Sequence, residues 1–266
     1  MKHHQYTKEQ ISEAISYWAR QLKLMTESYN NCVDALINEF GHDLVTSSER
    51  TYNLSKEDLK RMYDVLNFTL FSNELGSIQL EHWPEKLIVD KLNDNAEKSG
   101  ILDKKINEMP GAGVFSGICK DVLDKDGNIV DIDIHDEIIM LNKEYMNGCI
   151  FIFAVATLCH EMIHYYDRFT KEFHDKQLKA SQTKESFNSH KDQVFQEMMK
   201  EANSKGIHVV ESLEKTPFKL ANLNARYVLK NVIGEDEDCT SFVNANDYRY
   251  TMRARGSHSF VFAEFD

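Results

Sequence analysis

The stretch FIFAVATLCHEMIHYY, residues 151–166, decides how this sequence is interpreted. Its first half is apolar on nearly every side of a helix, which predicts a buried helix over about 148–169. Its second half carries the pattern HExxH in His160, Glu161 and His164. Because two histidines four positions apart lie on one face of a helix, about one turn from each other, they can share a metal ion.

The residue types of this pattern suit metal-assisted hydrolysis. Zn²⁺ accepts imidazole nitrogens, and a catalytic zinc site keeps one position open for water. Glu161 directly follows the first histidine, where it can take a proton from that water and pass it to a leaving amine. A buried His-Glu-His group without a metal would leave costly unsatisfied polar atoms. The sequence therefore predicts a metal site here.

A third protein ligand is needed, and the sequence offers Asp167, His174, Glu185 and His190. The metzincin spacing is excluded because Thr170 stands six residues after the second histidine. Glu185 would fit a gluzincin site, Asp167 an aspzincin-like site, and His174 lies in a polar stretch. His190 follows Ser189, the expected N-cap of an amphipathic helix that can dock beside the first one. This placement favours His190.

Composition limits the class of protein. The 266 residues contain 31 Lys and Arg against 43 Asp and Glu, and the net charge of -12 argues against a globally basic nucleic-acid binder. Five cysteines occur without a CxxC pair, which excludes a four-cysteine zinc ribbon and favours a reducing cytoplasm over a disulfide scaffold. No apolar run of 18 residues and no signal-peptide core occur, so we expect no membrane span.

The pattern along the chain mixes helical and strand signals. Apolar spacing, caps and stop signals predict helices at 7–40, 55–70, 148–169 and 189–205. Alternating β-formers predict strands at 77–92, 113–123, 129–134, 138–141 and 207–210, and a terminal hairpin at 248–262. Polar composition predicts loops at 46–53, 93–100 and 170–189. The sum is an α+β chain.

The order of these motifs resembles the SprT-like family, which includes bacterial SprT proteins and the eukaryotic DNA–protein crosslink protease Spartan. The family pattern is HExxH, a variable loop, and then His-Gly-x-x-Phe opening a helix. In this chain His190 is followed by Lys191 in place of the usual glycine, and one extra residue precedes Phe195. Residues 63–83 resemble the family's opening helix and first strand. The likeness spans roughly residues 55–212.

This resemblance implies a domain organisation. Residues 54–212 are expected to form a zincin-like, minigluzincin-type metallopeptidase domain with a small mixed sheet. Residues 1–53 would be an N-terminal helical extension, and residues 213–266 a C-terminal extension with a β-hairpin.

The resemblance also implies roles for individual residues. It implies His160, His164 and His190 as Zn²⁺ ligands and Glu161 as the general base of a zinc endopeptidase. It implies that an edge strand of the sheet pairs with extended protein or peptide substrate, and we expect this edge within residues 129–141. For a transition-state stabiliser the sequence leaves five donors open, namely Tyr165, Tyr166, Arg226, Tyr227 and Tyr248.

The chain also departs from the family. Many SprT proteins end in a four-cysteine zinc ribbon, but after the predicted site only Cys239 remains, and the hairpin at 248–262 would be a metal-free remnant. Arg249, Arg253 and Arg255 form its basic cluster. With the acidic net charge, DNA binding and the crosslink-repair role are not carried over as the favoured function.

Two alternatives stay open. One is a non-catalytic, metal-stabilised assembly protein that recruits a partner through an apolar N-terminal stripe of Ile11, Ala14, Ile15, Trp18 and Leu22. The other is a DNA-associated protease of crosslinked proteins. Residues 7–18 resemble short N-terminal helices of phage-encoded proteins, which would place the chain in a host cytoplasm.

Overall fold

The computed structural model describes residues 31–47, 51–100, 105–107, 109, 111–183, 189–207, 209, 248–254 and 259–265. The helices are α2 (Cys32–Phe40), α3 (His42–Thr46), α4 (Lys56–Phe71), α5 (Glu85–Lys98), α6 (Lys143–Met146), α7 (Phe151–Asp167), α8 (Lys171–Thr183) and α9 (Gln193–Ser204), with a 3-10 turn, η1 (Ser189–Lys191). The strands are β1 (Tyr52–Asn53), β2 (Gln79–Trp83), β3 (Gly113–Leu123), β4 (Ile129–Asn142), β5 (Asn147–Cys149), β6 (Tyr248–Ala254) and β7 (Ser259–Phe265). The mixture of helices and small sheets agrees with the predicted α+β class.

The central sheet has the strand order β2–β4–β3. Strand β2 runs parallel to β4, and β3 runs antiparallel to it. The prediction that residues 129–141 supply an edge is wrong for residues 138–141, where β4 is hydrogen-bonded to β2 on one side and to β3 on the other. Among the described strands, residues 129–137 of β4 pair with β3 alone. The edge strand beside α7 is β3.

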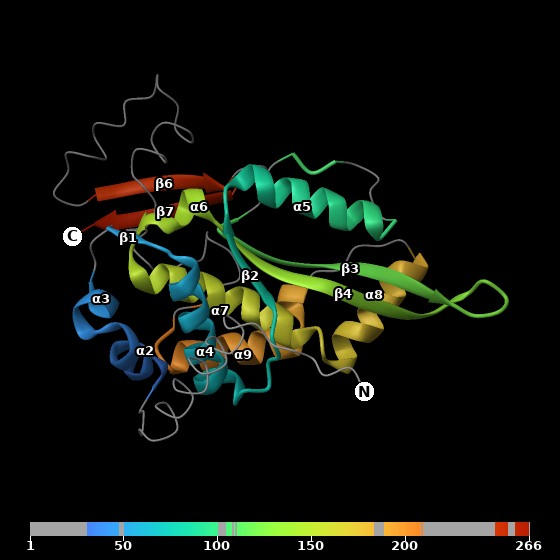
Figure 1. Ribbon diagram of the computed structural model, residues 1–266, viewed down its shortest axis with the longest axis horizontal. Helices are drawn as coiled ribbons and strands as arrows, with labels where there is room; N and C mark the ends of the chain where they lie inside the picture. The colour runs from blue at the N-terminus through green and yellow to red at the C-terminus, as the bar shows by residue number, and fades with distance from the viewer. Residues whose placement is uncertain are drawn as a thin grey trace, which may run out of the picture.

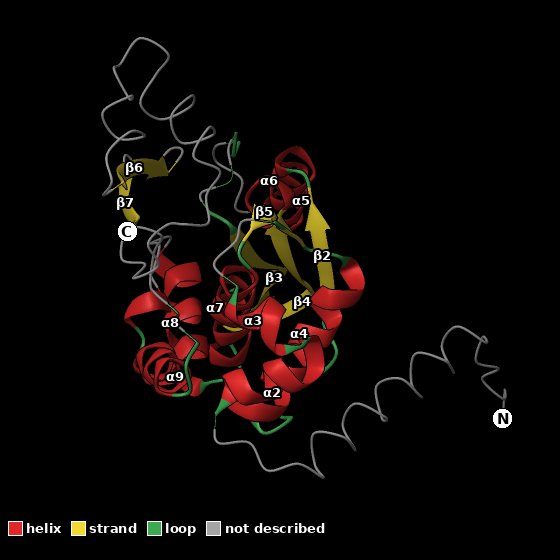
Figure 2. Ribbon diagram, turned by 90° about the vertical axis from the view of Figure 1, so that its left-hand side faces the viewer, coloured by secondary structure: helices red, strands yellow, loops and turns green. Residues whose placement is uncertain are grey.

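Helices cover both faces of this sheet. Helix α5 lies on one face, and α7 with α4 lies on the other (Figure 1). The alternation of side chains along β4 matches these layers: Ile138 and Met140 join a small cluster with α5, whereas Ile139 and Leu141 join the main core. The main core thus lies between the sheet and the helices α2, α4, α7 and α9, which gather on the α7 side in Figure 2.

Helix α7 is the centre of the main core. Its apolar first half is buried on nearly all sides, as the sequence predicts. The ring of Phe151 packs against the rings of Phe40 and Tyr52 at centroid distances of 4.8 and 5.1 Å. Packing at this end fixes the helix from which the HExxH residues project.

Side-chain hydrogen bonds cap the N-termini of α2 and α4 and so fix where these helices begin. Asn31 accepts a hydrogen bond from the Asp34 amide at 2.9 Å, and α2 ends at Gly41 as predicted, where φ is 93°. Ser55 caps α4 in the same way, also as predicted. The described residues of the expected N-terminal extension share the main core through Cys32 and Leu36, among others. Residues 1–30 lie outside the described part of the chain.

Residues 85–98 form helix α5, so the strand and loop predicted there are wrong. Only Glu85, Ile88, Val89 and Asn95 are buried, which leaves too few apolar positions for a clear helical pattern. The exposed Leu87 made the spacing look like that of a strand. Ion pairs four residues apart support the helix instead, at Lys86–Asp90 and Asp94–Lys98.

The predicted hairpin is confirmed but longer than expected. Strands β3 and β4 are joined by a turn in which Asp124 accepts hydrogen bonds from the Asp126 and Asn128 amides. The two strands predicted at 129–134 and 138–141 form one strand. A local irregularity at Asp136, whose φ is 53°, separates their patterns.

The stretch 170–189 was predicted as a loop, and most of it is helix α8. Thr170 accepts a hydrogen bond from the Phe173 amide at 3.1 Å and so begins the helix. An ion pair between Glu172 and Lys176 supports it on the surface. Since no residue of α8 is buried, the helix has no apolar stripe by which a sequence pattern would reveal it.

Three features complete the comparison with the predicted elements. Helix α9 ends at Lys205 and Gly206 as predicted, but the buried residues Ile207 and Val209 are not in a strand. The terminal hairpin is confirmed, because β6 and β7 pair antiparallel. In the described part of the chain, every helix is too short or too polar to cross a membrane.

Candidate metal centre

Three imidazole nitrogens meet beside α7. The Nε2 atoms of His160 and His164 are 3.1 Å apart, and the Nε2 atom of His190 lies 3.1 Å from the first and 3.0 Å from the second. Both α7 histidines project from one face, one turn apart, as their spacing predicts. His190 reaches them from the turn η1, so the favoured third candidate is the one that the structure brings to the pair.

This triangle fits a metal ion. Three nitrogens bound tetrahedrally to zinc at about 2.0–2.1 Å stand about 3.3 Å apart, close to the observed separations. Without an ion, three nitrogen atoms at this distance cannot all be satisfied by hydrogen bonds to one another. Burial, followed by the charges of His160 and His190, holds the pKa of His164 well below its ordinary value. The neutral imidazole that results is the form that binds a metal.

The outer nitrogen of His164 also has a partner. Ser189 Oγ lies 3.2 Å from His164 Nδ1 and can accept its hydrogen, which leaves Nε2 free to face the other two histidines. The predicted N-cap role of Ser189 is wrong, because α9 begins later, with Asp192 at the N-cap position. Ser189 instead joins the turn that carries His190 to the first pair of histidines.

The Phe195 ring packs against all three imidazole rings of the cluster. This side chain is fully buried, and its ring centroid lies 5.3, 4.7 and 4.9 Å from those of His160, His164 and His190. A rigid apolar surface in contact with all three rings limits their rotation. The sequence places Phe195 on an apolar helix face, but only the docking of α9 shows which side chains it supports.

The Glu161 side chain extends from α7 toward the edge strand β3. Its side chain is 5% exposed, and the Phe115 backbone amide hydrogen-bonds its carboxylate. Burial raises the pKa of Glu161 to about 8, although the Phe115 amide acts in the opposite direction. A cation held by the neighbouring histidines would lower this pKa, because opposite charge favours the carboxylate.

Gly113 on β3 makes room for this carboxylate. A Cβ atom at this position would stand 2.9 Å from Glu161 Oε1 and 2.9 Å from Thr157 Cγ2. Real Cβ atoms do not approach other atoms so closely, so a larger residue would displace the Glu161 side chain. Sequence reasoning placed Gly113 in a strand but did not connect it with the site.

The other candidate ligands lie elsewhere. His174 contacts Asp131 on β4 at 2.7 Å, away from the histidine cluster. Asp167 is buried in a second group of charged residues and accepts a hydrogen bond from Thr170 at 3.3 Å. Glu185 lies outside the described residues. Among the residues that the structure describes, the three histidines are the group with metal-ligand geometry.

The candidate oxyanion donors are not brought to the cluster by any described contact. Tyr165 packs on Phe115 with ring centroids 5.7 Å apart, and Arg168 hydrogen-bonds its hydroxyl. The Tyr166 hydroxyl donates to Glu74 at 3.5 Å. Arg226 and Tyr227 lie outside the described residues, as does the side chain of Tyr248.

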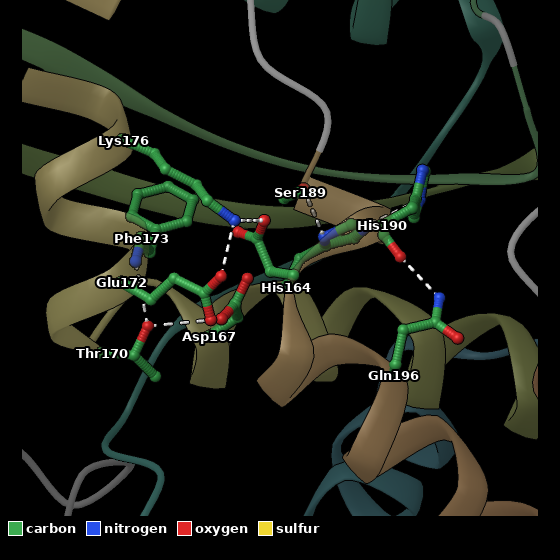
Figure 3. Close-up of polar contacts among 10 residues, drawn as sticks. His164, Asp167, Thr170, Glu172, Phe173, Lys176, Ser189, His190 and Gln196 are labelled. Carbon is green, nitrogen blue, oxygen red and sulfur yellow. Dashed lines mark hydrogen bonds and ion pairs between the residues drawn. The ribbon is translucent and has the colours of Figure 1, made fainter. Parts of the chain in front are cut away.

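A charged cluster that the sequence did not indicate lies next to the turn η1. Figure 3 shows Asp167 of α7 with Glu172 and Lys176 of α8. Lys176 also contacts Asp192 at the start of α9. Burial, followed by the charge of Asp192, raises the pKa of Asp167 to about 7. These residues belong to three different helices, so only the packing of those helices shows that Asp167, Lys176 and Asp192 interact.

Comparison with known proteins adds no identification. Neither the protein-family models, nor the curated proteins, nor the solved structures gave a match to this chain.

Proposed function

We propose that this protein is a zinc-dependent endopeptidase with a zincin-like fold of the SprT type. The observation that carries the proposal is the triangle of His160, His164 and His190 nitrogens, 3.0–3.1 Å apart, with the buried Glu161 directly after the first ligand. A purely structural site needs no carboxylate beside its first ligand. The combination therefore supports hydrolysis more than a structural metal.

In peptide hydrolysis the three histidines and Glu161 have different roles. The three histidines hold the zinc ion, which when bound supplies a Lewis acid and a water of lowered pKa. Glu161 accepts a proton at its carboxylate and delivers it to the leaving amine nitrogen. The Phe115 amide keeps this carboxylate in place, and the space beside Gly113 admits it.

Strand β3 provides the place for the substrate. Among the described strands β3 pairs with β4 alone. On β3 the Phe115 amide donates to Glu161 and the Cys119 amide to Ser99 Oγ at 2.9 Å, so an extended peptide would pair with the remaining backbone groups of this strand. Main-chain hydrogen bonds along such an edge hold a peptide in extended form, with little dependence on its side chains. Because Phe115 of β3 contacts Glu161, a peptide on this edge lies next to the proposed base.

The central experiment replaces Glu161 by Gln. The amide keeps the size of the side chain but cannot take up the proton, so we expect cleavage to fall by about 10²–10⁴-fold. Zinc content should stay at the wild-type value. The assay follows cleavage of unfolded casein and of a mixed peptide library by mass spectrometry, with metal content measured on the same samples. Undiminished cleavage by a zinc-loaded Glu161→Gln variant contradicts the mechanism.

The third ligand has its own control. His190→Ala removes one of three nitrogens, so both zinc affinity and cleavage should fall. His174→Ala serves as the matched variant, because this histidine lies at Asp131 and not at the cluster. Wild-type protein that binds zinc but cleaves no substrate would favour the alternative of a metal-stabilised binding protein.

A further inference from the structure

The strongest feature outside the three ligands is the charged cluster where α7, α8 and α9 meet (Figure 3). Asp167 stands in the last turn of α7, Lys176 in α8, and Asp192 at the N-cap position of α9. Asp167 and Asp192 are 0% and 1% exposed. Two carboxyl groups at this depth need a compensating partner, because burying a charge without one is costly.

Lys176 is that partner. Its Nζ atom contacts Asp192 Oδ1 and lies 2.6 Å from Glu172 Oε1. The protonated Asp167 carboxyl group in turn donates a hydrogen bond to the Asp192 carboxylate, so one ammonium group and one shared proton compensate the two buried carboxyl groups. Within the described part of the chain, no other Lys or Arg forms an ion pair with Asp192.

Asp192 is connected directly to the turn that carries His190. The Asp192 amide donates to the Ser189 carbonyl at 2.9 Å and closes the turn, and its own carbonyl accepts from the Gln196 amide at 3.1 Å. The Gln196 side chain donates to the His190 carbonyl at 2.5 Å. The backbone on both sides of His190 is therefore fixed by bonds that start at Asp192 or at the first turn of α9.

From these contacts we propose that Lys176 is a positioning residue for the third metal ligand. Its ammonium group holds Asp192, and Asp192 holds the turn from which His190 reaches the other two histidines. The inference rests on the proposed metal function and adds to it a residue on α8, a helix that contributes no ligand. No residue of α8 is fully buried, and the contacts between α8 and the start of α9 include the ion pair of Lys176 with Asp192.

Loss of Lys176 would act on the position of His190 through the neighbouring turn η1. Without Lys176 the Asp192 carboxylate would stay buried beside Asp167 with no cation to compensate its charge. The turn would open to admit water, and His190 would leave the position at which its Nε2 lies 3.0–3.1 Å from the other two nitrogens. Loss of outer contacts that orient metal ligands lowers metal affinity by about 10–100-fold.

The test compares Lys176→Met with Lys171→Met in the full chain. Lys171 lies on the same helix, is 86% exposed and pairs with Asp175, so its replacement removes an ion pair that is remote from η1. We measure zinc affinity by competition with a chromogenic chelator and the absorption spectrum of the Co²⁺-loaded protein. Lys176→Met should bind zinc about 10–100-fold more weakly and change the Co²⁺ spectrum. Lys171→Met should match the wild type, and Lys176→Arg, which keeps the charge, should recover part of the affinity.

A purely structural role gives a different result. In that case Lys176→Met lowers the melting temperature of the metal-free and the zinc-loaded protein equally, and the affinity and the Co²⁺ spectrum stay unchanged. This outcome overturns the positioning role and leaves the proposed function intact. A wild-type chain without zinc affinity, in contrast, overturns both.

Discussion

Helices α7 and α8 follow each other in the chain, yet different forces hold them in place. Twelve of the 17 residues of α7 are buried, whereas none of the 13 residues of α8 is. Helix α8 is attached through polar contacts instead, including His174 to Asp131 at 2.7 Å and Gln182 to the Ile129 carbonyl at 2.9 Å.

The difference explains how the candidate site is assembled. Apolar burial fixes the two histidines of α7, because close-packed side chains leave the helix little freedom to shift. The third histidine follows α8 in the chain, and we propose that the ion pair between Lys176 and Asp192 holds its position. Under this proposal the two histidines of α7 are held by the core, whereas the position of His190 depends on a polar contact that one substitution on α8 can remove.

The largest expected effect lies in the α7 core. Leu158→Ala removes a fully buried side chain, so the free energy of unfolding should fall by about 2–5 kcal/mol in chemical denaturation. Leu178→Ala on α8 is the matched control, because Leu178 is only partly buried. We expect a loss under about 1 kcal/mol there. Equal losses at the two positions would remove the distinction between the helices.

A second effect concerns the contact of α7 with β3. Gly113→Ala places a Cβ within 2.9 Å of Glu161 Oε1, so we expect the free energy of unfolding to fall by about 1–3 kcal/mol and cleavage to decrease. Gly111→Ala is the control, since its nearest neighbour is the Gly113 carbonyl oxygen at an ordinary 3.7 Å. Unchanged stability in the first variant would show that the Glu161 and Thr157 side chains move aside at little cost, which contradicts a close contact between α7 and β3.

A third prediction tests the last turn of α7 by pH. Because the pKa of Asp167 is raised from 3.8 to about 7 in the folded protein, its protonated form favours folding at low pH. That contribution is complete below about pH 4 and disappears as pH rises to about 7. Relative to Asp167→Asn, the wild type should lose up to about 1.4 kcal/mol per pH unit inside this window, or about 2 kcal/mol between pH 5 and 6.5, measured by denaturation of the metal-free protein. A constant difference from pH 5 to 7.5 would contradict the raised pKa.

The smallest effect is expected on α8. His174→Ala breaks the contact with Asp131, but both side chains are about half exposed, at 42% and 55%. Solvent screens such a pair, so the free energy of unfolding should change by less than about 1 kcal/mol. A larger loss in thermal or chemical denaturation would mean that α8 depends on this one contact, rather than on several weak ones.

The sequence predicted the helices that bury many apolar residues and missed the helices that are held by polar contacts. Helices α4 and α7 were predicted because their apolar residues recur at helical spacing and caps or apolar packing define their ends. Helices α5 and α8 were missed because they bury few or no apolar residues. Ion pairs four residues apart support both, and such pairs also occur in sequences that form no helix.

In the candidate site, too, the sequence predicts local spacing but not contacts between separate elements. The pair His160 and His164 could be predicted because helix geometry alone sets their spacing. His190 was a choice among four candidates, and it depended on the expectation that α9 docks beside α7. Phe195 belongs to the pattern that follows His190, but the sequence does not show that its ring contacts His160 and His164 on another helix. For Lys176 the sequence shows no sign of its contact with Asp192.

What the sequence by itself determined is the chemistry of α7: a buried helix, two histidines on one face and a glutamate beside the first. This information is local, because it depends only on the 3.6-residue period and on apolar burial. The tertiary structure alone decided that His190 completes the triangle and that β3, not β4, is the edge beside Glu161. Such choices depend on how distant elements dock, and docking energy is shared among many contacts that no short pattern records.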